Sequence, residues 1–227
     1  MTGLHKHLNP DDLLHVAVYA CLTTTFYSAA RLGEFLPKTL DCFKPETHVK
    51  PSDVHTDTDR QGLESTVFHI PRTKMSTTGE EVSWSRQDGV TDPEAALEAH
   101  MRVNNPPETG PLFAYRYTYL TKGKKIPKTM YRALTRNKFL EVINELARVA
   151  GMEALKGHSI RIGATLEYLL RGTPFDVVKV KGRWASDAFL VYLRKHAQIL
   201  APYMQAHSAQ NEEFIRIVIP GIQRQQS

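Results

Sequence analysis

One cationic segment, residues 156–195, constrains this chain more than any other part of its sequence. It holds eight Lys/Arg against three Asp/Glu, and this net charge of +5 equals that of the whole chain. The segment opens on a His-x-x-Arg motif at His158 and Arg161 and closes with Trp184 and Tyr192. Guanidinium, imidazole, indole and phenol groups on a basic background predict a surface that faces phosphate.

Charge is unevenly spread along the rest of the chain. The 227 residues are enough for one large domain or two small ones, and a pI of about 9.1 by itself favours nucleic acid only weakly. Residues 41–110 hold thirteen Asp/Glu and seven Lys/Arg, whereas residues 122–138 hold seven Lys/Arg and no acid. One part of the protein therefore suits a polyanion and another does not.

The two cysteines, Cys21 and Cys42, belong to no CxxC motif. We interpret them as thiols in a reducing compartment and expect no metal site. The polar first twelve residues do not resemble a signal peptide. Residues 12–30 lean apolar but hold a His, several Thr/Ser and two Tyr, so we expect a core helix there rather than a membrane span.

Hydrophobic periodicity predicts a mainly α-helical chain. The cap signal at residues 9–12 starts a helix that continues or restarts through residues 26–30 and ends near Gly33. Further helices are expected over 92–103, 129–150, 160–171, 174–182, from 186 past Tyr192, and from 202 to about 207.

Alternating residues predict a β-hairpin from 65–71 and 81–85, with Lys74 at the start of its long tip. Residues 37–45 are a candidate short strand, 50–62 a loop, and 112–119 a short strand or turn, followed by a basic loop over 122–128. The fold class expected is therefore α+β, mainly helical, with a small antiparallel sheet or hairpin at one edge.

Several of these residues have a plain structural interpretation when taken singly. Arg31 and Glu34, three residues apart, are most simply a solvent-exposed ion pair. Lys74 is by default a solvated turn lysine. Trp184 is equally consistent with core packing, and basic residues early in the 129–150 helix suit either a solvated face or a DNA backbone.

Together, the motifs resemble the catalytic domain of the tyrosine recombinases, the phage-integrase family, and especially recombinases of eukaryotic mobile elements. The resemblance covers about residues 10–205, and five segments in order carry it: Ala30-Arg31-Leu32-Gly33-Glu34, Thr73-Lys74, Gly157-His158-Ser159-Ile160-Arg161, Gly182-Arg183-Trp184 and Tyr192. It implies a catalytic domain over residues 1–208 and a tail over 209–227 that could exchange between subunits. The family's N-terminal core-binding domain is expected to be absent.

The resemblance also implies a site-specific DNA recombinase that acts through a 3′-phosphotyrosine intermediate without metal or other cofactor. Tyr192 would be the nucleophile and Lys74 the general acid. Arg31 and Arg161 would bind the phosphate oxygens, His158 would donate to the same oxygens or shuttle a proton, and Trp184 could bind a phosphate oxygen. Glu34 would orient Arg31 or a neighbour. Basic residues expected to contact DNA are Lys122, Lys124, Lys125, Lys128, Arg132, Arg136 and Arg183.

The implied partner is double-stranded DNA, bound by a homo-oligomer, with no membrane and no small-molecule cofactor. The expected location is the nucleus if the chain is eukaryotic, and otherwise the cytoplasm with the DNA. Two other functions stay open on the sequence. One is a type IB topoisomerase-like nicking activity, and the other is a domesticated or inactive DNA-binding module derived from a recombinase.

Overall fold

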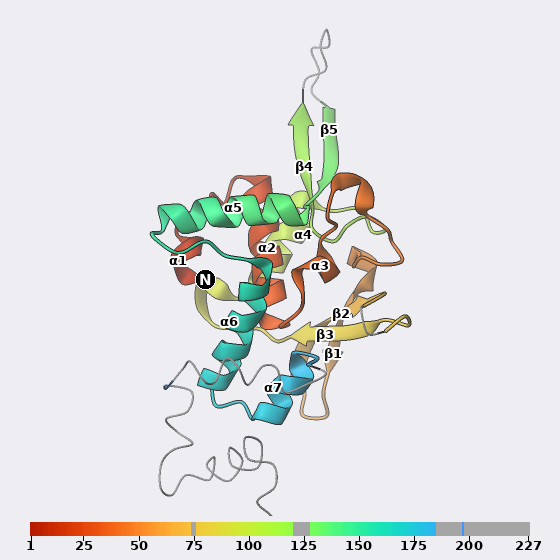
Figure 1. The fold of residues 1–227 in the computed structure, drawn as a ribbon. Helices are drawn as coiled ribbons and strands as arrows, with labels where there is room; N and C mark the ends of the chain where they lie inside the picture. Colours follow the sequence, from red (N-terminus) through yellow and green to blue (C-terminus); the bar gives the residue numbers. More distant parts are fainter. Residues whose placement is uncertain (74–75, 120–127, 185–196, 198–227) are drawn as a thin grey trace, which may run out of the picture. The chain divides into compact units, whose positions relative to one another are not determined.

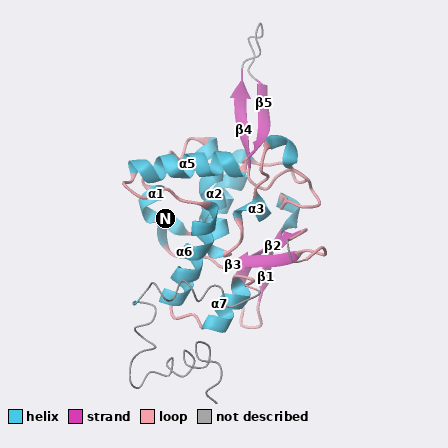
Figure 2. Cartoon of the chain, in the orientation of Figure 1, coloured by secondary structure: helices cyan, strands magenta, loops and turns pink. Residues whose placement is uncertain are grey.

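The computed structural model describes residues 1–73, 76–119, 128–184 and Ala197 (Figure 1). The chain divides into two compact units, Met1–Arg161 and Ile162–Ser227. Helices dominate, and two small antiparallel sheets accompany them (Figure 2). This confirms the expected α+β, mainly helical fold class. The division into a 1–208 domain and a 209–227 tail stays a prediction.

The first unit is built around helix α2 (Leu13–Tyr27), which is buried through every residue from Ala17 to Thr25. A helix without a solvated face belongs inside a core. Helices α4 (Pro93–Asn104) and α5 (Arg136–Val149) pack against it. In α5 the buried residues are Phe139, Val142, Ile143, Leu146 and Ala147, which form one apolar stripe. Short helix α1 (Thr2–His5) contributes Leu4 to the same core.

The ends of α2 correct the sequence prediction. Its cap is Asp12, whose carboxylate accepts hydrogen bonds from the backbone N–H groups of Leu14 (2.8 Å) and His15 (3.4 Å). The helix ends at Tyr27 rather than near Gly33, because Ala29 adopts a left-handed φ of 49°. The chain then turns into a separate short helix, α3 (Leu32–Phe35).

Three strands form the first sheet: β1 (Val54–Thr58), β2 (Glu64–Ile70) and β3 (Glu80–Trp84), in that order and antiparallel. The hairpin predicted from the alternating residues is confirmed as β2 and β3. The loop prediction for 50–62 was wrong over residues 54–58, because β1 is an edge strand with four exposed residues and no apolar alternation to reveal it. Residues 37–45 contain the 3₁₀-helix η1 (Leu40–Cys42), not a strand. Two more 3₁₀-helices are η2 (Pro51–Asp53) and η3 (Gly89–Thr91).

A second pair of strands, β4 (Ala114–Tyr119) and β5 (Lys128–Ala133), forms an antiparallel ribbon. The strand expected within 112–119 is thus confirmed, but the helix prediction for 129–150 was wrong over its first residues. Those residues pair with β4, and the helix starts only after Thr135, whose hydroxyl accepts a hydrogen bond from the backbone N–H of Lys138 (3.2 Å). Arg132 therefore lies on a strand and not on α5.

Helix α6 (Gly157–Leu170) begins in the first unit and continues in the second, where it is followed by α7 (Phe175–Lys181). The predicted helices 160–171 and 174–182 are confirmed, although α6 starts three residues earlier. The helices expected after residue 185 and the tail lie outside the described residues. No helix in the described part of the chain is long and apolar enough to cross a membrane.

A buried polar network joins α4 to α2 and to β4. His100 is fully buried, and its Nε2 must donate to the carbonyl oxygen of Leu112 (2.9 Å), because a carbonyl only accepts. Its Nδ1 therefore accepts from the amide of Asn104 (3.0 Å), which also donates to the Leu13 carbonyl (3.0 Å). The backbone N–H of Arg116 donates to the other end of that amide (3.0 Å). The network requires a neutral imidazole.

We predict that this network makes the protein acid-sensitive. Burial lowers the pKa of His100 from 6.5 to about 4, so the folded state binds fewer protons than the unfolded state between these values. The neutral His100 therefore contributes to the free energy of unfolding in full above pH 6.5. This contribution, about 3 kcal/mol in total, is lost as the pH falls toward 4. Urea unfolding at pH 7 and pH 5 measures it. His100→Gln, which does not titrate, should show a smaller difference between the two pH values than the wild-type protein; an equal difference would contradict the assignment.

Candidate functional site

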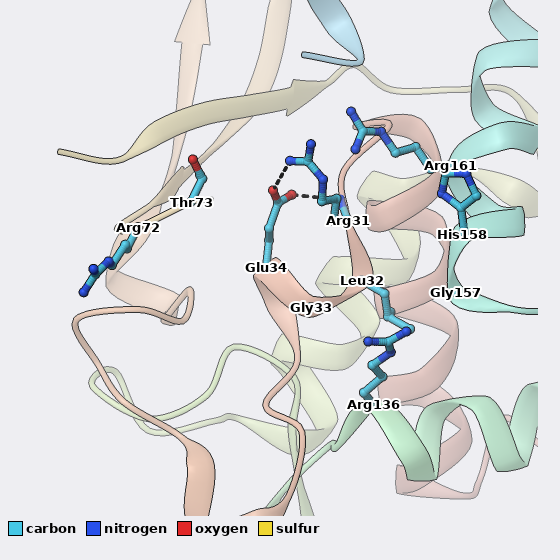
Figure 3. Close-up of a pocket in the computed structure, with 10 residues that line it drawn as sticks. All are labelled: Arg31, Leu32, Gly33, Glu34, Arg72, Thr73, Arg136, Gly157, His158 and Arg161. Carbon is cyan, nitrogen blue, oxygen red and sulfur yellow. Dashed lines mark hydrogen bonds and ion pairs between the residues drawn. The ribbon is translucent and has the colours of Figure 1, made fainter. Parts of the chain in front are cut away.

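A pocket of about 380 Å³ in the first unit collects positive charge from distant parts of the sequence (Figure 3). Four arginines, one histidine and one glutamate contribute to its lining, so its formal charge is +3 with the histidine neutral. The lining residues are Arg31, Leu32, Gly33, Glu34, Arg72, Thr73, Arg136, Gly157, His158 and Arg161.

Arg31 lies in the turn between α2 and α3, where it is held by Glu34. Its backbone N–H donates to Oε2 of Glu34 (2.8 Å), and its guanidinium Nη1 donates to Oε1 (3.1 Å). The Glu34 side chain is only 8% exposed, whereas that of Arg31 is 38% exposed. The simple interpretation as a solvent-exposed pair is therefore wrong. The buried Glu34 carboxylate fixes Arg31 and leaves part of its guanidinium group exposed to solvent.

His158 and Arg161 come from the first turns of α6. Gly157 lies against Leu32, since a Cβ built there would meet that side chain at 3.4 Å and the Arg136 guanidinium at 3.8 Å. This contact brings the start of α6 next to α3. Arg161 is 3% exposed and His158 is exposed, and their spacing of three residues places both on one side of the helix. The positive end of the α6 dipole adds to the potential of the pocket.

Two arginines of the pocket were not expected in it. Arg72 follows β2 and had no role expected from the sequence, and Arg136 was expected only as a DNA contact. In Figure 3 the guanidinium groups of Arg31 and Arg161 extend toward one end of the pocket, and that of Arg72 points away from them. Only the position of Arg72 immediately before Thr73-Lys74 could have suggested it.

The hairpin tip reaches this pocket through Thr73. Its hydroxyl accepts from the backbone N–H of Ser76 (3.0 Å), and its own N–H donates to the Ser76 carbonyl (2.9 Å). These two bonds close the turn that begins after Arg72. Lys74, the expected general acid, lies outside the described residues, and so its role stays a prediction.

A second hollow of about 480 Å³ adjoins the first and shares Gly33 and Arg136 with it. Its other charged or polar lining includes Lys38, His48 and Asn137. The backbone N–H of Arg136 donates to the Pro37 carbonyl (2.9 Å), which ties the start of α5 to the segment that carries Lys38. The two hollows therefore lie next to each other on the first unit, with Arg136 lining both.

The other expected site residues fall into three groups. Trp184 and Arg183 belong to the second unit, where Gly182 makes room for the indole; a Cβ on Gly182 would lie 2.3 Å from Nε1 of Trp184. Arg183 has a left-handed φ of 49°. The remainder lies outside the described residues: Tyr192, Lys122, Lys124 and Lys125. Lys128 and Arg132 are exposed on β5.

Among the residues that the structure describes, no group of His, Cys, Asp and Glu could hold a metal ion. The chemistry that this pocket offers is instead the binding of an anion by several guanidinium groups. Planar guanidinium groups donate pairs of hydrogen bonds that match the oxygens of a phosphate.

Comparison with solved structures places the fold. A FLP recombinase bound to a Holliday junction matches with a TM-score of 0.51 and 14% identity, over 85% of this chain and 44% of that chain. Two complexes of Flpe with Holliday junctions match with TM-scores of 0.49 at 15% and 14% identity, over 90% and 76% of this chain and 45% and 40% of theirs. The chain thus spans less than half the length of these recombinases.

The expected tyrosine-recombinase-like fold is confirmed by the first of these matches. No protein-family model matches the sequence, and no curated protein matches it. At this identity the likeness establishes the fold alone.

We predict that Arg31 and Glu34 are energetically coupled well beyond an ordinary surface pair. A double-mutant cycle with Arg31→Ala and Glu34→Ala, measured by urea unfolding, should give a coupling energy of about 1–2 kcal/mol. Because the guanidinium is partly exposed to water, this is less than a fully buried pair would give. The exposed pair Lys138–Glu141, at the same spacing and 2.7 Å apart, is the matched control and should give about 0.5 kcal/mol or less. Equal coupling in the two cycles would show that burial of Glu34 has no effect.

Proposed function

We propose that this chain cleaves and rejoins DNA strands as a tyrosine recombinase. Tyr192, as the phenolate that nearby cations favour, would attack a backbone phosphorus and form a phosphotyrosine bond to the 3′-phosphate as the bond from phosphorus to the 5′-oxygen breaks. Lys74 would give a proton to the departing 5′-oxygen. Attack by the 5′-hydroxyl of a second strand would reverse the step, so that no bond energy is lost and no nucleotide or metal is needed.

The observation that carries this proposal is the common pocket of Arg31 and Arg161. These residues are far apart in the sequence, yet both line one depression together with His158. The transition state of phosphoryl transfer carries extra negative charge on its non-bridging oxygens. Guanidinium groups fixed in advance around that position stabilise the charge without having to reorganise during the reaction.

The roles proposed for the individual residues follow from their chemistry. Arg31 and Arg161 would each bind a non-bridging oxygen, with Glu34 holding Arg31 in place. His158 would donate to the same oxygens or move a proton, since an imidazole can do either near neutral pH. Trp184 could only donate from its indole N–H. Arg72 is added here as a further cation at the same phosphate or its neighbour.

Double-stranded DNA is the proposed partner. The hollow next to the pocket, with Arg136 shared and Lys38 beyond it, would receive an adjacent phosphate of the same strand. Lys122, Lys124, Lys125, Lys128 and Arg132 would extend the contact, as would Arg183. The FLP structure that matches with a TM-score of 0.51 is a Holliday-junction complex, which supports DNA as the partner. We further propose a homo-oligomer on the DNA and, for a eukaryotic chain, a nuclear location.

Covalent trapping tests the nucleophile. A library of nicked duplexes of random sequence is incubated with the protein, and protein-linked DNA is recovered under denaturing conditions and sequenced. We expect recovered DNA with the wild-type chain and none with Tyr192→Phe, because only the phenol can form the link. Tyr203→Phe, a change at the other tyrosine near the end of the chain, is the matched control and should retain the adduct. Binding of DNA without any adduct would favour an inactive DNA-binding module, and adducts without strand exchange would favour a topoisomerase-like activity.

Removal of Arg161 should affect the chemistry more than the binding. On a recovered substrate we expect Arg161→Ala to lower the cleavage rate by at least about 10²-fold, as for other transition-state donors. Equilibrium binding should change far less, because the other phosphate contacts remain. Lys138→Ala, a change to a basic residue of α5 that does not line the pocket, is the control. A loss confined to DNA affinity would contradict the catalytic role of Arg161.

A further inference from the structure

The β4–β5 ribbon carries an aromatic and basic face whose tyrosines have no role in the proposed reaction, although two of its cations, Lys128 and Arg132, are proposed DNA contacts. Figure 1 shows the two strands extending away from helices α2, α4 and α5 of the first unit. Tyr115, Tyr117 and Tyr119 alternate along β4 and therefore share one face. Their cross-strand partners are Arg132, Met130 and Lys128 respectively, so three tyrosines, one methionine and two cations form that face. We call it the tyrosine face.

The side chains of the tyrosine face become more exposed to solvent from Tyr115 to Tyr119. Tyr115 is 7% exposed and belongs to the core, Tyr117 is partly buried against it, and Tyr119 is 37% exposed. Met130 beside them is 44% exposed. The inner part of the row is thus held by packing, and its outer part is open to solvent. A row anchored in this way is rigid before any ligand arrives, which reduces the entropy lost on binding.

The exposed end of the row is already stacked. The rings of Tyr117 and Tyr119 lie 5.8 Å apart at an angle of 23°, and the Arg132 guanidinium lies 4.5 Å from the Tyr117 centroid. Arg132 pairs with Tyr115, on the core side of Tyr117, and Tyr119 lies on the side of the ribbon tip. The guanidinium and the two rings therefore form a short column, of which Tyr119 is the outermost member among the described residues.

Charge indicates what this column can bind. The described residues of the ribbon, 114–119 and 128–133, include three Lys/Arg and no acid. Stacked aromatic rings flanked by cations are the arrangement by which proteins hold single-stranded nucleic acid, because every base has a π face and every nucleotide a phosphate.

We propose that the tyrosine face binds unpaired bases of a DNA strand. A base extends the column by stacking on Tyr119, and Lys128, which pairs with Tyr119 across the ribbon, contacts the adjoining phosphate. The inference deepens the proposed function and rests on it for DNA as the partner. The ribbon would thus bind the DNA segments that become unpaired when strands are cut and exchanged.

Two other uses of this face fit the structure less well. Proteins read base edges in a duplex groove with extended Arg, Asn or Gln side chains. Here Arg132 lies over the Tyr117 ring. Apart from Lys128, the other exposed groups of the face are aromatic or apolar. A protein partner would be favoured by the exposed Tyr and Met, but the excess of positive charge without any acid in the described ribbon favours a polyanion.

Binding measurements with two probes test the proposal. The protein carries Tyr192→Phe, so that no covalent step interferes, and fluorescence anisotropy is recorded with labelled oligo(dT) of about 20 nucleotides and with a blunt duplex of the same length. We expect Tyr119→Ala to weaken oligo(dT) binding about tenfold and duplex binding less than about twofold. Tyr119→Phe keeps the ring and should bind oligo(dT) like the parent protein.

Tyr131→Ala is the matched control. Tyr131 is 42% exposed on the same ribbon, but it pairs with Arg116 and so lies on the opposite face. Its removal should leave oligo(dT) binding unchanged. The proposal is overturned if the parent protein does not bind oligo(dT), if Tyr119→Ala and Tyr131→Ala have equal effects, or if duplex binding falls as much as oligo(dT) binding. A change in sedimentation of Tyr119→Ala without DNA would identify a protein interface instead. None of these outcomes depends on adduct formation, which tests the proposed reaction separately.

Discussion

Repulsion among four guanidinium groups is the constraint around which the pocket is built. Arg31, Arg72, Arg136 and Arg161 line one pocket, and Glu34 is the one acidic residue among the described residues that line it. Charges of one sign gathered in one pocket repel one another, and rigid elements or a bound anion offset this repulsion. The buried Glu34 carboxylate offsets part of the repulsion and at the same time fixes Arg31. The remaining excess of positive charge is what makes the pocket suited to a phosphate.

The rigidity comes from the core beneath. Helix α2 is buried through most of its length, and both α3 and β4 pack against it. Phe35 of α3 packs edge-to-face on Phe68 of the first sheet, with centroids 5.5 Å apart, and on Phe113 at 5.8 Å. The turn that carries Arg31 is therefore continuous with the densest part of the unit. A side chain placed this way keeps its position when its neighbours carry the same charge.

The same core connects the pocket with the ribbon. Phe113 precedes β4, and the His100–Asn104 network binds both the start of α2 and the backbone of Arg116. Arg136 follows β5 by three residues and lines both hollows. A DNA strand bound in the pocket could thus also contact Arg136, which lies between the pocket and the ribbon in the sequence. The proposed reaction site and the tyrosine face use two ends of one rigid scaffold, which is an arrangement that separates cleavage from the binding of unpaired bases.

The sequence by itself determined the elements whose signals are local. The apolar stripe of α5, the cap of α4 at Asp92 and the alternation in β2 and β3 were all readable, and the ordered motifs around Arg31 and His158 indicated the fold. Strands β1 and β5 were missed, because an exposed edge strand has no apolar alternation and residues 129–133 fit a helical period as well as a strand. Only the tertiary structure decided that Glu34 is buried, that Gly157 packs on Leu32, and that Arg72 and Arg136 join the pocket. Those features depend on contacts between segments far apart in the chain, and a local pattern carries no information about which distant side chains will share the same space.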